Sequence, residues 1–267
     1  GGVEEVEAGP DAALHAWEPL GEDGALIISL IEHPGADGAK ERAELDAMAE
    51  AVRRRLPALP PGETWAAMQV VAAVREVVYG EWGFAGNRDD YYDPLNSFLV
   101  DVIRRRRGIP ITLAVVFQAV ARRVGLRLEG VNSPGHFLLR GYCGGTGSDG
   151  GEFFVDPFEG RVLALDAVQD LLVQFGLSTE LVHTPPCNSR QMFARMLRNL
   201  MGLYQPFEHA SLALLRNQAR DAESRFMLCL SQLQVVSQSF DQDGAFLHFA
   251  AQLHEYRWAR TARILHP

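Results

Sequence analysis

Two side chains in this sequence have the types and the spacing of an acid–base pair. His136 opens the apolar run His-Phe-Leu-Leu, and Asp156 directly follows the run Glu-Phe-Phe-Val. Short runs of this kind, separated by a glycine-rich segment, predict two antiparallel strands, so we expect the two residues to lie close together. A carboxylate beside an imidazole can orient the ring and let it act as a base, but the pair supplies no nucleophile.

A buried helix precedes the pair and must help to position it. Pro110 lies in the first turn of this helix, where a missing N–H has no cost. Nearly every side chain from 111 to 120 is apolar, which predicts a helix that is enclosed on most sides. Arginines near its C-terminus suit the helix dipole, and Gly125 ends it.

The charge balance excludes some classes of function. The 267 residues carry a formal net charge of −9, which argues against general binding to nucleic acids or to anionic membranes. The basic run 104–107 is local, and we interpret it as the solvated end of a helix rather than as a phosphate site. No apolar run reaches the roughly 18 residues of a membrane span.

The three cysteines are Cys143, Cys187 and Cys229, widely spaced and without a CxxC pair, which favours neither a disulfide framework nor a zinc site. No third ligand joins the His–Asp pair at a recognisable spacing, so we expect no metal and no cofactor. These features predict a soluble protein of a reducing compartment, either the cytoplasm or an organelle matrix or stroma. Since the chain begins at Gly1 and not at Met, any targeting peptide would lie outside it.

Changes in composition and periodicity divide the chain into four segments. Residues 1–20 are acidic without a sustained period and are interpreted as a tail, and 21–80 form an N-terminal helical segment. Residues 81–175 are the core that contains the pair. Residues 176–267 are helical, and their spacing looks like a tetratricopeptide-type array, although no signature of about 34 residues is legible.

Hydrophobic periodicity and turn residues predict the individual elements. A third short strand is expected at 162–165. The expected helices, besides the buried one, cover 24–33, 39–56, 65–79 with Thr64 as its cap, a turn or more around 98–103, 166–175, 189–204, 207–216, 221–237 and 244–266.

The loop 81–99 is rich in aromatic and Asx residues, among them Tyr91 and Tyr92. Asp93 and Pro94 open a turn in it, and Asn96 or Ser97 is expected to cap the helix that follows. A loop of this composition either packs tightly or lines a site, and packing is the simpler interpretation.

Residues 82–140 closely resemble the SirB-type family of transglutaminase-like proteins, whose domain also occurs in the middle of a eukaryotic F-box protein. The resemblance covers roughly residues 22–205 and includes a weaker match at 195–200. Its main motifs are Trp-Gly-Phe-Ala-Gly-Asn at 82–87, Tyr-Tyr-Asp-Pro-Leu-Asn-Ser at 91–97, Arg-Gly-Ile-Pro-Ile-Thr at 107–112, Val-Asn-Ser-Pro-Gly-His-Phe-Leu-Leu-Arg at 131–140 and Val-Asp-Pro-Phe at 155–158.

The resemblance implies a mostly helical α+β fold, in which a papain-like core of one helix and a small antiparallel sheet is flanked by helical segments. In catalytic members of the superfamily, the nucleophilic cysteine opens the buried helix. Counting back from Gly125, that position is Pro110, which has neither thiol nor hydroxyl. His136 and Asp156 do match the superfamily's histidine and aspartate.

Two other residues carry groups that could act as nucleophiles. Thr112 lies two positions beyond Pro110 and is interpreted as a capping or back-bonding threonine, while Cys143 follows the histidine in a glycine-rich loop and is interpreted as an ordinary free thiol. The cleft in which catalytic members would bind their substrate is expected between the buried helix and the two strands. Its expected lining residues are Tyr91, Tyr92, Asn96, Pro110 and Thr112.

These observations favour a non-catalytic binding or assembly module that contacts protein partners through its C-terminal helices. The alternative is an amide hydrolase or acyl transferase in which His136 is the base, Asp156 orients it, and the nucleophile is an unidentified group or an activated water. A third interpretation makes the chain a subunit of a larger assembly.

Overall fold

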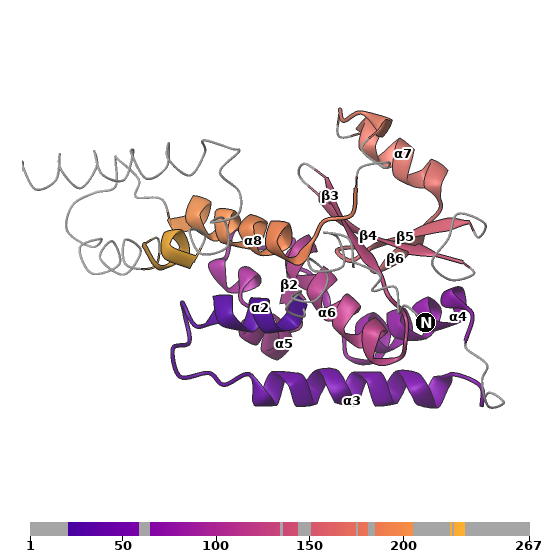
Figure 1. Ribbon diagram of the computed structural model, residues 1–267, viewed down its shortest axis with the longest axis horizontal. Helices are drawn as coiled ribbons and strands as arrows, with labels where there is room; N and C mark the ends of the chain where they lie inside the picture. Colours follow the sequence, from indigo (N-terminus) through magenta and orange to yellow (C-terminus); the bar gives the residue numbers. More distant parts are fainter. Residues whose placement is uncertain are drawn as a thin grey trace, which may run out of the picture.

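The chain combines helices with two small sheets, which confirms the mixed α+β architecture expected from the sequence (Figure 1). The computed structural model describes residues 21–58, 65–133, 136–143, 151–174, 176–180, 185–204, 225 and 227–232.

The larger sheet has four antiparallel strands in the order β3-β4-β5-β6. Two of the strands, β4 and β5, are those predicted from the apolar runs, and β6 is the short third strand. The sequence did not predict β3, because its residues Glu-Gly-Val-Asn-Ser carry no strand periodicity and become a strand by pairing with β4. The bounds are Glu129–Ser133 for β3, His136–Tyr142 for β4, Glu152–Asp156 for β5 and Arg161–Leu163 for β6.

Helix α6, Pro110–Arg123, is the centre of the main core, and 11 of its 14 residues are buried. It packs against β4 on one side and against helices from the N-terminal part on the others. Gly125 has a φ of 88° just after the helix, a conformation that suits glycine, so the predicted stop is confirmed.

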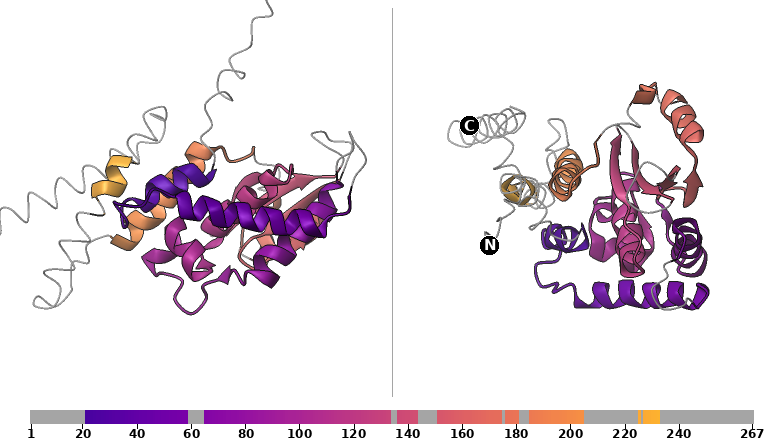
Figure 2. Two further views of the ribbon diagram at one scale, coloured as in Figure 1. Left: turned by 90° about the horizontal axis from the view of Figure 1, so that it is seen from below. Right: turned by 45° about the vertical axis from the view of Figure 1, so that its right-hand side comes forward.

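Three N-terminal helices surround α6 (Figures 1 and 2). They are α2 (Gly21–Ser29), α3 (Ala39–Arg55) and α4 (Ala67–Arg75). Helix α4 continues into a π-helical segment, η1 (Glu76–Glu81), so the helix predicted over 65–79 changes its winding near its end.

The aromatic loop is held by a two-residue parallel sheet, in which β1 (Ala85–Gly86) pairs with β2 (Arg107–Gly108). After it come a short 3-10 helix, η2 (Pro94–Ser97), and α5 (Leu99–Arg105). The predicted cap is wrong here. Asp93 caps η2 by accepting from Leu95 N at 3.0 Å, and α5 begins after Phe98 without a side-chain cap.

Two further helices complete the arrangement. Helix α7, Leu165–Gln174, lies across the face of the sheet opposite α6 and forms a second small core, in which Val168 and Leu172 contact Leu138 and Phe154 (Figure 2). Helix α8, Ser189–Tyr204, packs against α2 and has the bounds that the sequence predicted.

Several expectations fall on residues outside the described ranges. These are the tail 1–20, the Thr64 cap, the helices at 207–216 and 244–266 and most of the one at 221–237. The tetratricopeptide-like interpretation and the division into four segments therefore stay predictions. Within the described part of the chain, no helix is long and apolar enough to cross a membrane.

Candidate functional site

His136 and Asp156 meet at one end of the larger sheet. His136 is the first residue of β4 and Asp156 the last residue of β5, and the antiparallel register places both side chains on one face of the sheet. Nε2 of His136 lies 3.2 Å from Oδ1 of Asp156. The structure thus brings together the two residues that the sequence singled out, both of them largely shielded from solvent.

The carboxylate of Asp156 is buried, and neighbouring protein groups hydrogen-bond to it. Its Oδ1 accepts from the backbone N–H groups of Phe158 at 3.1 Å and Glu159 at 3.2 Å, and Arg161 lies 3.4 Å from Oδ2. Burial raises the pKa of this carboxyl, but His136, the Glu159 amide and the Arg161 charge bring the pKa below its ordinary value of 3.8. Asp156 is therefore ionised at neutral pH, as an orienting partner of an imidazole must be.

The turn after Asp156 is anchored on η1. Tyr79 donates its hydroxyl to the Pro157 carbonyl at 2.7 Å. Burial, together with the charge of Asp156, raises the pKa of Tyr79, so the hydroxyl stays protonated and remains a donor. Gly160 has a φ of 64° and lies so close to the Tyr79 ring that a Cβ would be 2.8 Å from it. The turn that shapes the Asp156 site thus depends on contacts with a distant helix.

Phe158 connects the same turn to the aromatic loop. Its ring lies against Gly86, 5.9 Å from the ring of Tyr91 and 5.4 Å from the guanidinium of Arg88. Arg88 also forms an ion pair with Glu159. Tyr91 contacts Tyr92 edge-on, and the Tyr92 side chain is 76% exposed. The tyrosines expected near the pair therefore lie next to its supporting turn, with Tyr92 open to solvent.

The other expected lining residues are buried and make structural hydrogen bonds. Asn96 accepts from Asn87 at 2.9 Å and donates to the Asp90 carbonyl at 2.7 Å. The Thr112 hydroxyl donates to the Asn96 carbonyl at 2.7 Å and accepts from Ile109 N at 3.2 Å. Thr112 therefore caps α6, as interpreted from the sequence, and its hydroxyl is engaged by the backbone.

Pro110 is the first residue of α6 and is buried. Its assignment, with Asn96 and Thr112, to the lining of a cleft stays a prediction. In the described part of the chain, these three residues support the loop and the helix start rather than present polar groups to solvent.

Arg195 is a neighbour of the pair that the sequence reasoning did not single out. It lies on α8, and its Nη1 donates to Oδ1 of Asn132 and, at 2.7 Å, to the carbonyl of Ser133, the residue paired with His136. Its guanidinium carbon lies 5.7 Å from the centre of the Phe137 ring. The weak family match at 195–200 was the one signal in the sequence that marked this residue.

The position of Cys143 and the protonation of Cys187 and Cys229 argue against these cysteines as nucleophiles for His136. Cys143 follows β4, so it lies about 20 Å from His136 at the usual rise of a strand. Cys187, which the sequence reasoning put in the helical tail, pairs with Gly130 at the edge of β3, and burial raises the pKa of its thiol to about 11. Burial also raises the pKa of Cys229 to about 12. Cys187 and Cys229 are thus neutral thiols at pH 7.

No group of three or more His, Cys, Asp or Glu side chains that could hold a metal ion occurs among the residues the structure describes. The described site thus combines a His–Asp pair at the end of an antiparallel sheet with a buried helix, α6, that packs against β4. The model of the transglutaminase-like superfamily matches residues 39–198. The chain belongs to this superfamily.

Two groups of relatives are similar to the chain. The UPF0162 protein of Xylella fastidiosa strain 9a5c is 35% identical over 188 residues, which are 67% of this chain and 63% of that protein. The F-box only protein 21 of Mus musculus is 37% identical over 139 residues, which are 51% of this chain and 22% of the mouse protein. The human F-box only protein 21 is 32% identical over 68% of this chain and 32% of its own length.

The matches thus span less than two thirds of these relatives' own length. No solved structure matches the chain at a significant level. Membership of the superfamily agrees with the resemblance found in the sequence, while the narrower SirB-type assignment stays a prediction.

Proposed function

We propose that this protein is a non-catalytic transglutaminase-like module that binds a protein partner at the site formed by His136, Asp156 and the aromatic loop. The observation that carries this proposal is Pro110 at the first position of α6, where the resemblance places the catalytic cysteine. Proline has no group that can attack a carbonyl.

Three observations support the proposal. The Thr112 hydroxyl is committed to backbone hydrogen bonds, so it is not a substitute nucleophile. The thiols of Cys187 and Cys229 are protonated at neutral pH. The solvent-exposed ring of Tyr92 beside Tyr91 offers an aromatic surface of the kind enriched in protein interfaces.

The relatives support a modular role. A segment similar to this chain makes up 22% of the mouse protein named F-box only protein 21, where it is one part of a longer chain. The C-terminal segment, for which the sequence predicts helices and which lies mostly outside the described residues, is proposed as a second contact with the partner. The protein would then be a subunit of a larger assembly.

The test is affinity purification of the tagged chain from a native extract, followed by sizing and mass spectrometry. We expect a defined complex that weakens when Tyr92 is replaced by Ala. Met68→Ala is the matched control, because Met68 is an apolar side chain, also exposed, on α4. A chain that elutes alone at its own mass of 29.5 kDa would contradict the proposal.

One observation favours a second candidate, an amide hydrolase or acyl transferase. The His136–Asp156 pair is intact, with an ionised carboxylate held in place by backbone donors. Labelling with a thiol-directed electrophile at neutral pH separates the two candidates. A single cysteine that reacts fast and loses this reactivity in His136→Ala supports the enzyme, whereas slow and uniform labelling supports the binding module.

A further inference from the structure

Arg195 differs from the other arginines that are withdrawn from solvent. Every other buried or half-buried arginine in the described ranges forms an ion pair with a carboxylate, whereas Arg195 forms none there. The paired arginines are Arg42, Arg105, Arg106, Arg123, Arg140 and Arg225. A half-buried cation without an anion is costly, so its position requires an explanation.

The geometry of Arg195 leaves its recognition edge available. Both of its hydrogen bonds, to Asn132 and to the Ser133 carbonyl, use Nη1. The edge formed by Nε and Nη2 makes no hydrogen bond within the described part of the chain. This is the edge with which a guanidinium binds a carboxylate through two parallel hydrogen bonds.

A second unsatisfied group lies at the same end of the hairpin. Ser133 is only 2% exposed, and its Oγ has no hydrogen-bond partner among the described residues. Buried hydroxyl groups in native proteins are nearly always hydrogen-bonded, so this hydroxyl is a candidate to bind a ligand. Ser133 also carries the carbonyl that fixes Arg195 and pairs with His136 in the sheet.

Electrostatics link Arg195 to the aromatic side of the site. Burial lowers the pKa of the Arg195 guanidinium, which is the expected cost of an unpaired cation. Burial raises the pKa of Tyr91, and the Arg195 charge counteracts part of that rise, so the two groups lie within electrostatic range. Tyr91 in turn contacts Phe158, next to the Asp156 turn.

We propose that Arg195 binds a carboxylate of an acidic peptide segment in the partner, with Nε and Nη2 as donors and the Ser133 hydroxyl beside them. This inference rests on the proposed function, because it assigns a chemical class to the partner of the same site. The chain as a whole carries a net charge of −9, so it has no general attraction for acidic peptides. Binding that depends on Arg195 therefore reports a local site.

The test measures binding of an end-blocked, fluorescently labelled tetraglutamate peptide to the full chain by fluorescence anisotropy. Arg195→Gln is expected to weaken binding about tenfold or more, the effect of losing two hydrogen bonds to a charged group. Arg195→Lys keeps the positive charge but loses the planar guanidinium that donates two parallel hydrogen bonds, so it should also weaken binding. Arg198→Gln is the matched control, since Arg198 is an exposed arginine of α8 without a carboxylate partner in the described part of the chain.

Unlabelled tetraglutamate should compete for the site, while tetraglutamine and inorganic phosphate should not. No binding to the unmodified chain, equal binding by the Arg195→Gln and Arg198→Gln variants, or competition by phosphate as strong as by tetraglutamate would overturn the assignment. Thermal unfolding of each variant checks that the chain is folded. If Arg195→Gln does not fold, the comparison is made with Arg195→Lys.

Repeating the affinity purification with the Arg195→Gln variant distinguishes a failure of this inference from a failure of the proposed function. Capture of that partner with undiminished yield by Arg195→Gln would overturn the role of Arg195 and leave the binding module standing. Failure of the unmodified chain to capture any partner would count against the module itself.

Discussion

Asp156 keeps its charge in a buried position because hydrogen-bond donors and cations meet it on several sides. Two backbone N–H groups of its own turn, the imidazole of His136 and the guanidinium of Arg161 surround the carboxylate. These contacts favour the ionised form in the native state more than water favours it in the unfolded chain. The residue therefore stabilises the fold as well as orienting the histidine.

Asp156→Asn tests this contribution. We expect the variant to lose about 2–3 kcal/mol of unfolding free energy at pH 7, since hydrogen bonds to a charged group are lost. The pKa of Asp156 is lower in the folded state, so its contribution is complete above the ordinary value of 3.8 and is lost as the pH falls through the lower folded pKa. Urea unfolding from pH 7 to pH 2 should show the wild type converging on the variant only at the acidic end.

Asp89→Asn is the control for that experiment, because Asp89 lies on the exposed part of the aromatic loop. Its effect should stay within about 0.5 kcal/mol at every pH. A constant difference between the wild type and Asp156→Asn over the whole pH range would contradict the linkage.

At the level of elements, the site is assembled where the β5–β6 turn docks on the aromatic loop and on η1. Tyr79 fixes the Pro157 carbonyl, and Phe158 packs on Gly86, which leaves no room for a side chain there. The loop is in turn tied to the start of α6 through the hydrogen bond from Thr112 to Asn96. Contacts from residues 79–112, far from Asp156 in the sequence, thus set the position of its carboxylate.

Gly86→Ala tests this docking. An added Cβ would lie 2.5 Å from the Phe158 ring, so the ring and its turn must move. We expect a loss of about 1–3 kcal/mol in unfolding free energy, the usual cost of overpacking, measured by denaturant unfolding. Gly35→Ala is the matched control, since an added Cβ there meets nothing within 4 Å, and it should be close to neutral. Similar effects of the two substitutions would mean that the contact with Phe158 does not hold the turn.

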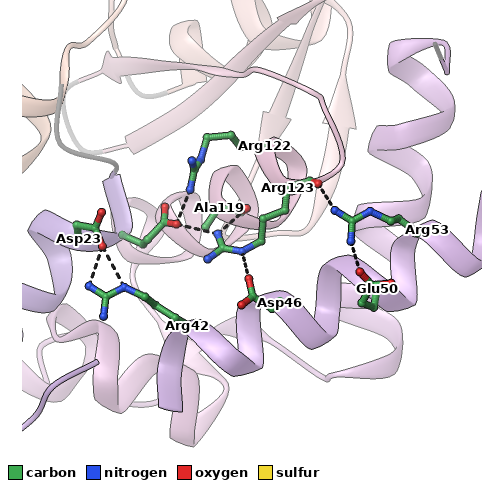
Figure 3. A network of polar contacts seen from close by, with 9 residues as sticks. Asp23, Arg42, Asp46, Glu50, Arg53, Ala119, Arg122 and Arg123 are labelled. Carbon is green, nitrogen blue, oxygen red and sulfur yellow. Dashed lines mark hydrogen bonds and ion pairs between the residues drawn. The ribbon is translucent and has the colours of Figure 1, made fainter. Parts of the chain in front are cut away.

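Across the whole molecule, ionic contacts fasten the N-terminal helices to the end of α6 (Figure 3). Glu22 of α2, with 4% of its side chain exposed, lies 2.5 Å from Arg122 and 2.7 Å from Arg123. Arg123 also pairs with Asp46 of α3 at 2.6 Å, and its carbonyl accepts from Arg53 (Figure 3). These cations lie at the helix C-terminus, where the dipole favours them.

Glu22→Gln should therefore weaken the attachment of the N-terminal helix α2 to α6. We expect a loss of about 3 kcal/mol in unfolding free energy, because one buried carboxylate is removed from between two arginines. Glu50→Gln is the matched control, since Glu50 pairs with Arg53 on the surface, and its cost should stay below about 1 kcal/mol. Chemical denaturation with a tryptophan fluorescence readout compares the two variants. An equal loss of unfolding free energy would contradict the role of Glu22 in holding α2 against α6.

The parts of this protein that local signals encode were predictable from the sequence. The bounds of α8 and the start of α3 and α6 follow from apolar periodicity and from proline and glycine at the ends. The strand pair that carries His136 and Asp156 follows from two short apolar runs. These signals work because the side chains that decide them lie within a few residues of each other.

Only the tertiary structure decided the rest of the site. Strand β3 has no periodicity of its own and exists through its ladder with β4. Arg195 reaches Ser133 from 62 positions along the chain, and Cys187 joins the sheet edge from 57 positions beyond Gly130, because residues 185–204 fold back toward the hairpin. Such contacts depend on how distant elements pack, and no local pattern specifies that packing.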